Sequence, residues 1–195
     1  DELQRRNINL LFCIGGDGTL KGAQAIAQAA NKRQANISVV GVPKTIDNDL
    51  GFVEKTFGFE TSVQIASEII TSAHHEAEGA ENGIGIVKLM GRDSGFITAT
   101  ASLANSIVDF CLIPETPFQI GGTEGICAAI QRRLQQNSHA VIVVAEGAGQ
   151  DLFKNSESRI DASGNILKDD IGELLKAEIT TYFKQRNLAI SIKYL

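Results

Sequence analysis

Short apolar runs alternate along the chain with longer segments whose apolar residues recur every three or four positions. The short runs have the length of buried strands, and the longer segments have the spacing of amphipathic helices. The predicted strands cover residues 10–14, 37–42, 84–89, 107–113 and 140–145. The predicted helices cover residues 1–8, 19–33, 57–76, 94–105, 121–134 and 171–183. This alternation predicts an α/β fold with mostly parallel sheets flanked by helices.

The pattern changes at three places. Residues 51–55 are expected to form a loop, and the polar residues 150–168 a surface excursion with a turn at 161–165. The chain is expected to divide near residues 59–61, so that residues 1–60 are part of one domain and residues 61–195 most of a second.

Composition limits the function classes. The 195 residues are 43% hydrophobic and 21% charged, as in a globular domain, and no apolar stretch reaches the roughly 18 residues of a membrane span. No signal peptide is recognisable at the first residues, so we expect a cytoplasmic protein. The net charge is −5, and Lys and Arg form no stripe, which disfavours nucleic acid as a partner. A small phosphorylated substrate remains compatible, because local Arg, Lys and backbone N–H groups hold it.

The cysteines and histidines do not suggest a metal or disulfide site. Cys13, Cys111 and Cys127 lie in apolar runs and are predicted to be reduced core thiols. His74 and His75 are predicted to be solvated at a polar helix end, and with no third ligand nearby a zinc site is not expected.

Two short motifs, each directly after a predicted strand, carry the candidate chemistry. The first is the turn from Gly15 to Thr19, Gly-Gly-Asp-Gly-Thr. Its glycines allow the backbone to approach a phosphate closely, and Asp17 is an oxygen ligand suited to Mg²⁺. Thr19 is expected to cap the following helix. The alternative is a plain strand-to-helix turn in which the Asp bonds its own backbone.

The second motif runs from Pro43 to Asp49, Pro-Lys-Thr-Ile-Asp-Asn-Asp. In extended chain, Thr45, Asp47 and Asp49 point the same way. Neighbouring carboxylates raise each other's pKa, and a positioned Asp can take the proton of an attacking alcohol. The alternative is a polar loop with an Asx-turn.

Polar residues also follow two further predicted strands. Arg92, in Met90-Gly91-Arg92, can neutralise phosphate oxygens, and Glu146 can accept hydrogen bonds from sugar hydroxyls. The alternative for each is a surface ion pair. Because the carboxyl ends of parallel strands form the ligand crevice, these groups are expected on one rim. They indicate metal-assisted phosphoryl transfer to a hydroxyl, which requires Asp17 and Asp47 to share one cavity.

The two motifs, Met90-Gly91-Arg92 and the run Pro-Glu-Thr-Pro-Phe at 114–118 occur in an order and spacing that resemble the 6-phosphofructokinase family over about residues 1–195. The resemblance implies Rossmann-like sheets in a two-domain architecture that is incomplete here. It implies that residues 1–60 are a partial nucleotide-binding domain and residues 61–195 most of a sugar-phosphate-binding domain. The implied reaction is the glycolytic transfer of phosphate from MgATP to the 1-hydroxyl of fructose 6-phosphate, giving fructose 1,6-bisphosphate.

The resemblance also implies a role for each motif residue. Asp47 is the proton acceptor and Asp17 the magnesium ligand. The implied ATP-binding residues are Gly15, Gly16, Asp17, Gly18 and Thr19. The implied substrate-binding residues are Thr45, Ile46, Asp47, Asp49, Met90, Gly91, Arg92 and Glu146.

By the same resemblance, Gly18 and Lys44 bear on the phosphoryl donor. Members that use pyrophosphate carry an Asp where this chain has Gly18, so Gly18 favours ATP as the donor. In contrast, the Lys at position 44 is similar to the residue that the pyrophosphate-dependent members carry there. The pairing of Gly18 with Lys44 resembles the plant and protist-type ATP branch, as does the run from Gly147 to Gln150. The alternatives are a pyrophosphate-dependent enzyme, a non-catalytic regulatory subunit, and an NAD or lipid kinase, against which Thr45–Asp49 argues.

The resemblance further implies an allosteric homo-oligomer, a dimer or tetramer. Gly83 departs from the classical bacterial members, which have an Arg there that reaches the neighbouring subunit's substrate phosphate. The family's amino-terminal nucleotide strand and its carboxy-terminal 6-phosphate ligands are expected outside residues 1–195. We therefore expect this chain alone to bind poorly and to turn over little or nothing.

Overall fold

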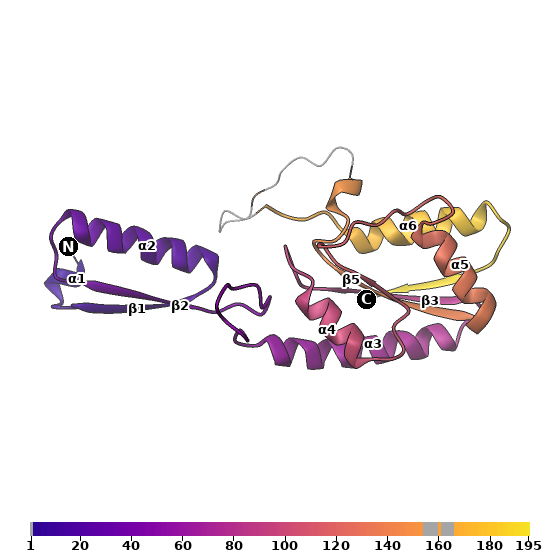
Figure 1. Ribbon diagram of the computed structural model, residues 1–195, viewed down its shortest axis with the longest axis horizontal. Helices are drawn as coiled ribbons and strands as arrows, with labels where there is room; N and C mark the ends of the chain where they lie inside the picture. Colours follow the sequence, from indigo (N-terminus) through magenta and orange to yellow (C-terminus); the bar gives the residue numbers. More distant parts are fainter. Residues whose placement is uncertain (1, 154–159, 161–165) are drawn as a thin grey trace.

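The computed structural model describes residues 2–153, 160 and 166–195, which form two lobes that each contain a sheet (Figure 1). The first lobe contains α1 (Glu2–Arg5), β1 (Leu10–Gly15), α2 (Asp17–Lys32) and β2 (Ser38–Pro43). Strands β1 and β2 pair in parallel, from Leu10 opposite Ser38 to Gly15 opposite Pro43. Residues 44–58 connect this lobe to the second.

The second lobe is built on a four-stranded parallel sheet with the order β4-β5-β3-β6. Its strands are β3 (Gly83–Leu89), β4 (Phe110–Leu112), β5 (His139–Ala145) and β6 (Ser191–Tyr194). Its helices are α3 (Phe59–Glu78), α4 (Phe96–Ala104), α5 (Ile126–Asn137), the 3₁₀ turn η1 (Gln150–Leu152) and α6 (Ile171–Lys184). Helices α3 and α4 cover one face of the sheet and α5 and α6 the other (Figure 1).

The central strands β3 and β5 are buried on both faces. Val87, Val141 and Val143 pack under α3 and α4, whereas Ile86 and Ile142 pack under α5 and α6. A parallel sheet covered on both faces has nearly continuous apolar strands, which explains the apolar runs at residues 84–89, broken by Lys88, and 140–145. The predicted α/β class, with parallel sheets flanked by helices, is confirmed.

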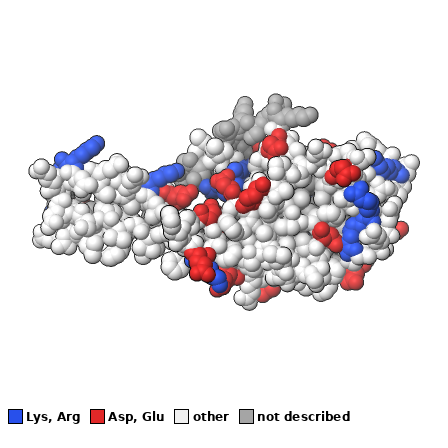
Figure 2. Space-filling view, viewed as in Figure 1, with Lys and Arg blue, Asp and Glu red and all other residues white. Residues whose placement is uncertain are grey.

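In the first lobe, helix α2 covers only one face of the two-stranded sheet. Ala23 and Ala30 of α2 are buried, while Leu10, Phe12 and Ile14 of β1 point the other way and are exposed, Ile14 by 66%. In the view of Figure 2 this lobe shows few charged side chains, and acidic and basic side chains gather where the two lobes meet. The division at residues 60 and 61 into two domains stays a prediction.

Four element predictions need correction. Helix α2 begins at Asp17 with Gly16 as its N-cap, so Thr19 lies inside the first turn and does not cap it. Helix α5 begins at Ile126, not at residue 121, since Gly122 is left-handed with φ of 84° and the N-cap Gly125 is extended with ψ of 162°. Strand β4 spans three residues only. Strand β6 was not predicted, although apolar and polar residues alternate along residues 190–194.

The cysteine and histidine predictions hold in part. The three cysteines are free, with Cys127 buried, Cys13 half-buried and Cys111 exposed, so the core assignment is wrong for Cys111. His75 is exposed, but His74 is half-buried with its ring 5.0 Å from that of His139, so the prediction of a solvated His74 is wrong. No helix in the described ranges has the length and apolar character to cross a membrane. The turn predicted at 161–165 lies outside the described residues.

Candidate functional site

The pairing of β1 with β2 brings the two motifs together. Gly15 ends β1 opposite Pro43, which ends β2, and the backbone N–H of Lys44 donates to the Gly15 carbonyl at 2.8 Å. The glycine turn and the loop of residues 44–49 therefore start side by side, as expected for motifs at the carboxyl ends of parallel strands.

The glycine turn passes directly into α2. Gly16 is the N-cap and supplies no side-chain hydrogen bond to the first turn. The positive end of the helix dipole therefore lies at the turn, where it favours an anion. Asp17 is exposed in the first helical turn. Gly15 is buried under Thr19, whose hydroxyl oxygen would lie 2.3 Å from a Cβ on Gly15, so a larger residue does not fit there.

The loop that carries Asp47 is bent, which corrects the expectation of extended chain. The Thr45 hydroxyl oxygen accepts a 3.2 Å hydrogen bond from the backbone N–H of Asp47. Asn48 is left-handed, with φ of 57°, and its side-chain oxygen accepts a 2.9 Å bond from the Thr56 N–H. The Thr45 side chain thus bends the loop in an ST-turn, whereas the alternative interpretation was an Asx-turn.

A cavity of about 420 Å³ lies at this point, with walls from the first lobe, the connecting segment and the second lobe. It is lined by Gly16, Asp17, Gly18, Thr19, Lys44, Thr45, Ile46, Asp47, Asp49, Met90 and Arg92. Asp17 and Asp47 therefore share one cavity, as the phosphoryl-transfer hypothesis requires. Asp49 reaches the same cavity despite the bend in the loop.

Three predicted site residues do not line this cavity: Gly15, Gly91 and Glu146. Gly91 is buried with φ of 139°, and its carbonyl accepts a 3.1 Å bond from the N–H of Gly147. A Cβ on Gly147 would lie 1.9 Å from the Arg92 carbonyl oxygen. The turn that begins at Glu146 therefore packs directly against the turn that carries Arg92.

The carboxylates of the site act on one another. Burial raises the pKa of Asp47, and the charges of Asp49, Glu146 and Asp17 raise it further, while Arg92 opposes them. Glu146 is thus close enough to affect Asp47 although it is not on the cavity wall. A carboxylate with a raised pKa is a better proton acceptor than an ordinary Asp.

The side chains that line the cavity suit Mg²⁺, which is shared between protein and substrate, better than a metal that protein ligands hold alone. In the described part of the chain, no three His, Cys, Asp or Glu residues cluster as metal ligands. Mg²⁺ is usually bound by one or two carboxylates together with substrate phosphates and water. The exposed carboxylate of Asp17, beside the helix N-terminus on the cavity wall, fits that role.

Two supporting contacts were not expected from the sequence. The Ser94 hydroxyl donates a 3.1 Å hydrogen bond to the Asp47 carbonyl, and Ser94 is 5% exposed. The Gln150 side chain bonds the backbone at Glu146 and Asp169. Ser94 lies two residues after Arg92, and Gln150 ends the run that starts at Gly147, but no local pattern indicates the partner of either residue.

Comparison with known proteins gives consistent results. A family model described as phosphofructokinase matches residues 1–190. The chain is 51% identical to a Borreliella burgdorferi protein named ATP-dependent 6-phosphofructokinase, over all of this chain and 45% of that protein. It is 50% identical to ATP-dependent 6-phosphofructokinase 7 of Arabidopsis thaliana, over all of this chain and 41% of the plant protein.

Solved structures agree on the fold. A structure of Pichia pastoris phosphofructokinase in the T-state matches with a TM-score of 0.67 and 21% identity, over 99% of this chain and 20% of the yeast chain. The chain therefore spans less than half the length of each of these similar proteins.

Proposed function

This chain belongs to the phosphofructokinase family, and from that premise we propose that it is the central part of an ATP-dependent 6-phosphofructokinase. The proposed reaction moves the γ-phosphoryl group of ATP to the 1-hydroxyl of fructose 6-phosphate. The observation that carries the proposal is the shared cavity, in which Asp17 of the first lobe faces the same space as Asp47 and Arg92.

Asp47 acts as the general base. As the sugar 1-hydroxyl oxygen forms its bond to the γ-phosphorus, the bond from that phosphorus to the ADP oxygen breaks and the hydroxyl proton passes to Asp47. The burial and neighbouring carboxylates that raise the pKa of Asp47 support this role. Arg92 balances the negative charge of the phosphoryl oxygens.

The glycine turn binds the nucleotide phosphates. Gly16, Gly18 and Thr19 line the cavity at the start of α2, and the helix dipole favours the phosphate charge. Asp17 holds Mg²⁺ together with those phosphates, and the ion, when bound, neutralises negative charge on the nucleotide. Thr45, Asp49 and Met90 position the sugar phosphate.

ATP is the proposed donor because Gly18 leaves the cavity wall uncharged where a carboxylate would repel the α-phosphate. Lys44 also lines the cavity, and it is the feature that keeps pyrophosphate as the second candidate donor. The similar proteins from Borreliella and Arabidopsis are both named ATP-dependent.

We further propose a cytoplasmic homo-oligomer, a dimer or tetramer. The three free cysteines are consistent with a reducing compartment. The oligomer is proposed by analogy with the family, and sedimentation of the full-length protein measures it.

A donor comparison tests the proposal. The full-length protein is assayed with fructose 6-phosphate and either MgATP or magnesium pyrophosphate, and fructose 1,6-bisphosphate is measured. We expect product from ATP, loss of product with excess EDTA, and loss in the Asp47→Ser variant. Product from pyrophosphate alone would identify a pyrophosphate-dependent 6-phosphofructokinase instead. Product from neither donor would reject the proposed function.

A further inference from the structure

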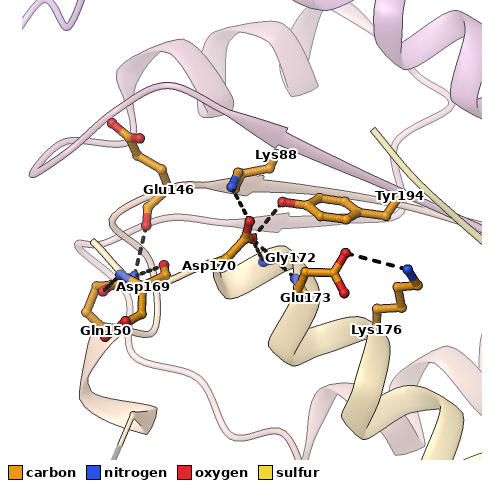
Figure 3. A network of polar contacts seen from close by, with 9 residues as sticks. All are labelled: Lys88, Glu146, Gln150, Asp169, Asp170, Gly172, Glu173, Lys176 and Tyr194. Atoms are coloured by element: carbon orange, nitrogen blue, oxygen red, sulfur yellow. Dashed lines mark hydrogen bonds and ion pairs between the residues drawn. The ribbon is translucent and has the colours of Figure 1, made fainter. Parts of the chain in front are cut away.

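Gln150 uses both ends of its side-chain amide to join two backbone segments (Figure 3). Its Nε2 donates to the Glu146 carbonyl at 2.9 Å and to the Asp169 carbonyl at 3.1 Å. Its Oε1 accepts from the Asp169 N–H at 3.0 Å. Three bonds from one half-buried side chain hold the turn after β5 to the segment that enters α6.

The rest of the turn from Glu146 to Gln150 is determined by packing. Gly147 lies against the Arg92 carbonyl, and Ala148 is fully buried in the core under α5 and α6. Gly149 has φ of 61°, and a Cβ there would meet Phe118 at 2.8 Å. The three central residues are Gly, Ala and Gly, so Glu146 and Gln150 are the residues of the turn whose side chains can make polar contacts.

The segment that Gln150 contacts, residues 168–170 before α6, is itself bonded to the sheet and to the turn at Asp93. Asp170, the N-cap of α6, accepts bonds from Lys88 of β3 at 2.8 Å and from Tyr194 of β6 at 2.6 Å. Burial opposes the charged carboxylate, but the bonds from Lys88 and Tyr194 outweigh it and lower the pKa of Asp170 to about 2. Lys168 pairs with Asp93, next to Arg92, at 2.8 Å. Gln150 thus connects Glu146 to a segment that is bonded to β3, to β6 and to the turn next to Arg92.

The backbone of Glu146 is held while its carboxylate remains available. In Figure 3 the Glu146 carbonyl faces Gln150, and the carboxylate points away from the contact network. A second bond, from the Glu146 N–H to the Leu89 carbonyl at 2.9 Å, fixes the other side of the same residue. Two backbone bonds, one of which depends on Gln150, therefore hold the main chain from which the Glu146 carboxylate projects.

We infer that Gln150 is a positioning residue for Glu146 and holds its carboxylate near Asp47, where a sugar bound in the cavity would bring its hydroxyls within reach. This inference rests on the proposed sugar-phosphate kinase activity. Gln150 touches neither substrate and acts only through Glu146. Its loss is expected to weaken sugar binding and slow transfer, while nucleotide binding, which depends on the glycine turn of the first lobe, is unchanged.

The test compares two variants of the full-length protein. Gln150→Met keeps the length of the side chain and removes all three hydrogen bonds. The control is Asn82→Gly, which removes an amide that donates to the Ala189 carbonyl at 3.0 Å and leaves a glycine at a left-handed position. Each variant thus loses a side-chain amide bond to backbone that flanks α6, at Asp169 before the helix or at Ala189 after it. Asn82, however, precedes β3, at the end of the sheet opposite Glu146.

For Gln150→Met we expect the KM for fructose 6-phosphate to rise and kcat to fall, each by about tenfold, since misplacement of a binding group is costly. The KM for ATP is expected to stay within about twofold, and Asn82→Gly is expected to leave all three constants within about twofold. Equal effects of the two variants on the sugar KM, or an equal rise in both substrates' KM values for Gln150→Met, would overturn the inference.

Hydrogen exchange separates failure of the inference from failure of the proposed function. In Gln150→Met the amides of residues 146–150 and 169–170 are expected to exchange faster, and those of β6 are not. This readout does not need turnover. Wild-type protein without kinase activity would reject the function, and unchanged exchange in residues 146–150 would reject the Gln150 contact as a restraint on Glu146.

Discussion

The hydroxyl of Ser94 donates a 3.1 Å hydrogen bond to the backbone carbonyl of Asp47, across an interval of 47 residues. Ser94 directly precedes the N-cap of α4 in the second lobe, whereas Asp47 belongs to the segment that leaves the first lobe. The candidate base is therefore attached to the second lobe by a buried side chain. Ser94 thereby contacts the backbone of Asp47 through a bond to its carbonyl.

The Ser94→Ala variant tests this attachment. It removes the hydroxyl that donates to the Asp47 carbonyl. We expect the loss of this bond to lower the free energy of unfolding by about 1 kcal/mol and to lower kcat about tenfold. Steady-state kinetics and thermal melting of the full-length protein measure the two effects. Ser72→Ala is the control, because Ser72 donates to the Glu68 carbonyl at 3.0 Å on the exposed face of α3. A kcat equal in both variants would contradict the positioning role.

Replacing the candidate base tests its role directly. Asp47→Ser is expected to lower kcat by about 10²–10⁴-fold, the range for loss of a general base, with the KM for fructose 6-phosphate little changed. Initial rates at saturating substrate measure the loss. Asp151→Asn, at an exposed carboxylate of η1, is the control. A kcat near that of the wild type would remove Asp47 from the base role.

The raised pKa of Asp47 predicts the acid side of the pH profile. Protonation of Asp47 removes the base, so kcat/KM is expected to fall as the pH drops through a value above the ordinary Asp pKa of 3.8. Glu146→Gln removes one charge that raises this pKa, so the fall should move to lower pH. The comparison is made on the pH profiles of the wild type and the variant. A shift to higher pH would contradict the assignment of the limb to Asp47.

The same shift predicts the pH dependence of stability. Because the pKa of Asp47 is higher in the folded than in the unfolded state, its carboxylate destabilises the fold once the pH exceeds both values. Asp47→Asn is therefore expected to raise the melting temperature at neutral pH. The gain should vanish below pH 3.8, where the carboxyl is protonated in both states. A gain that is independent of pH would point to a cause other than this charge.

Gly18 predicts donor choice. Gly18→Asp adds a carboxylate to the wall of the cavity, and repulsion of the α-phosphate is expected to lower kcat/KM for ATP at least about tenfold, or about 1.4 kcal/mol. Kinetics with ATP and with pyrophosphate measure the change. Lys44→Gly is the companion variant, expected to lower any use of pyrophosphate and to preserve use of ATP. Unchanged ATP kinetics in Gly18→Asp would break the donor argument.

The contact between Gly147 and Arg92 predicts a stability effect. Gly147→Ala places a Cβ 1.9 Å from the Arg92 carbonyl oxygen, and the forced backbone shift is expected to cost about 1–3 kcal/mol. Gly121→Ala is a matched control, since a Cβ there meets no atom within 4 Å. Denaturant unfolding of both variants measures the difference. Equal midpoints would show that the two turns separate easily.

The sequence predicts the second lobe well where burial is complete. Strands β3 and β5 are apolar apart from Lys88 and His139 because helices cover both faces, so their residues carry a clear signal. Strand β6 was missed because its alternating Ser191 and Lys193 interrupt the apolar run that identified the other strands. The start of α5 was placed too early because nothing local reveals the left-handed Gly122.

The cavity was predictable because each lining residue lies in a motif at the end of a strand or in the loop that follows it. The contacts that hold those motifs in place were not. Ser94 meets Asp47 and Gln150 meets Asp169 only after the elements have packed, so no local spacing encodes either pair. The bend at residues 45–48 was also missed, since the Thr45 side chain accepts a backbone bond that extended chain would not make.

The two sheets share no strand, and residues 44–58 form the covalent link between the lobes. The Ser94 bond attaches Asp47 to the second lobe, and the Lys44 N–H bonds the Gly15 carbonyl of the first, so two residues, Thr45 and Ile46, separate the two attachment points. Any change in the position of one lobe relative to the other would therefore alter the distance between Asp17 and Asp47, while the Asp47 backbone would stay with the lobe that carries Arg92.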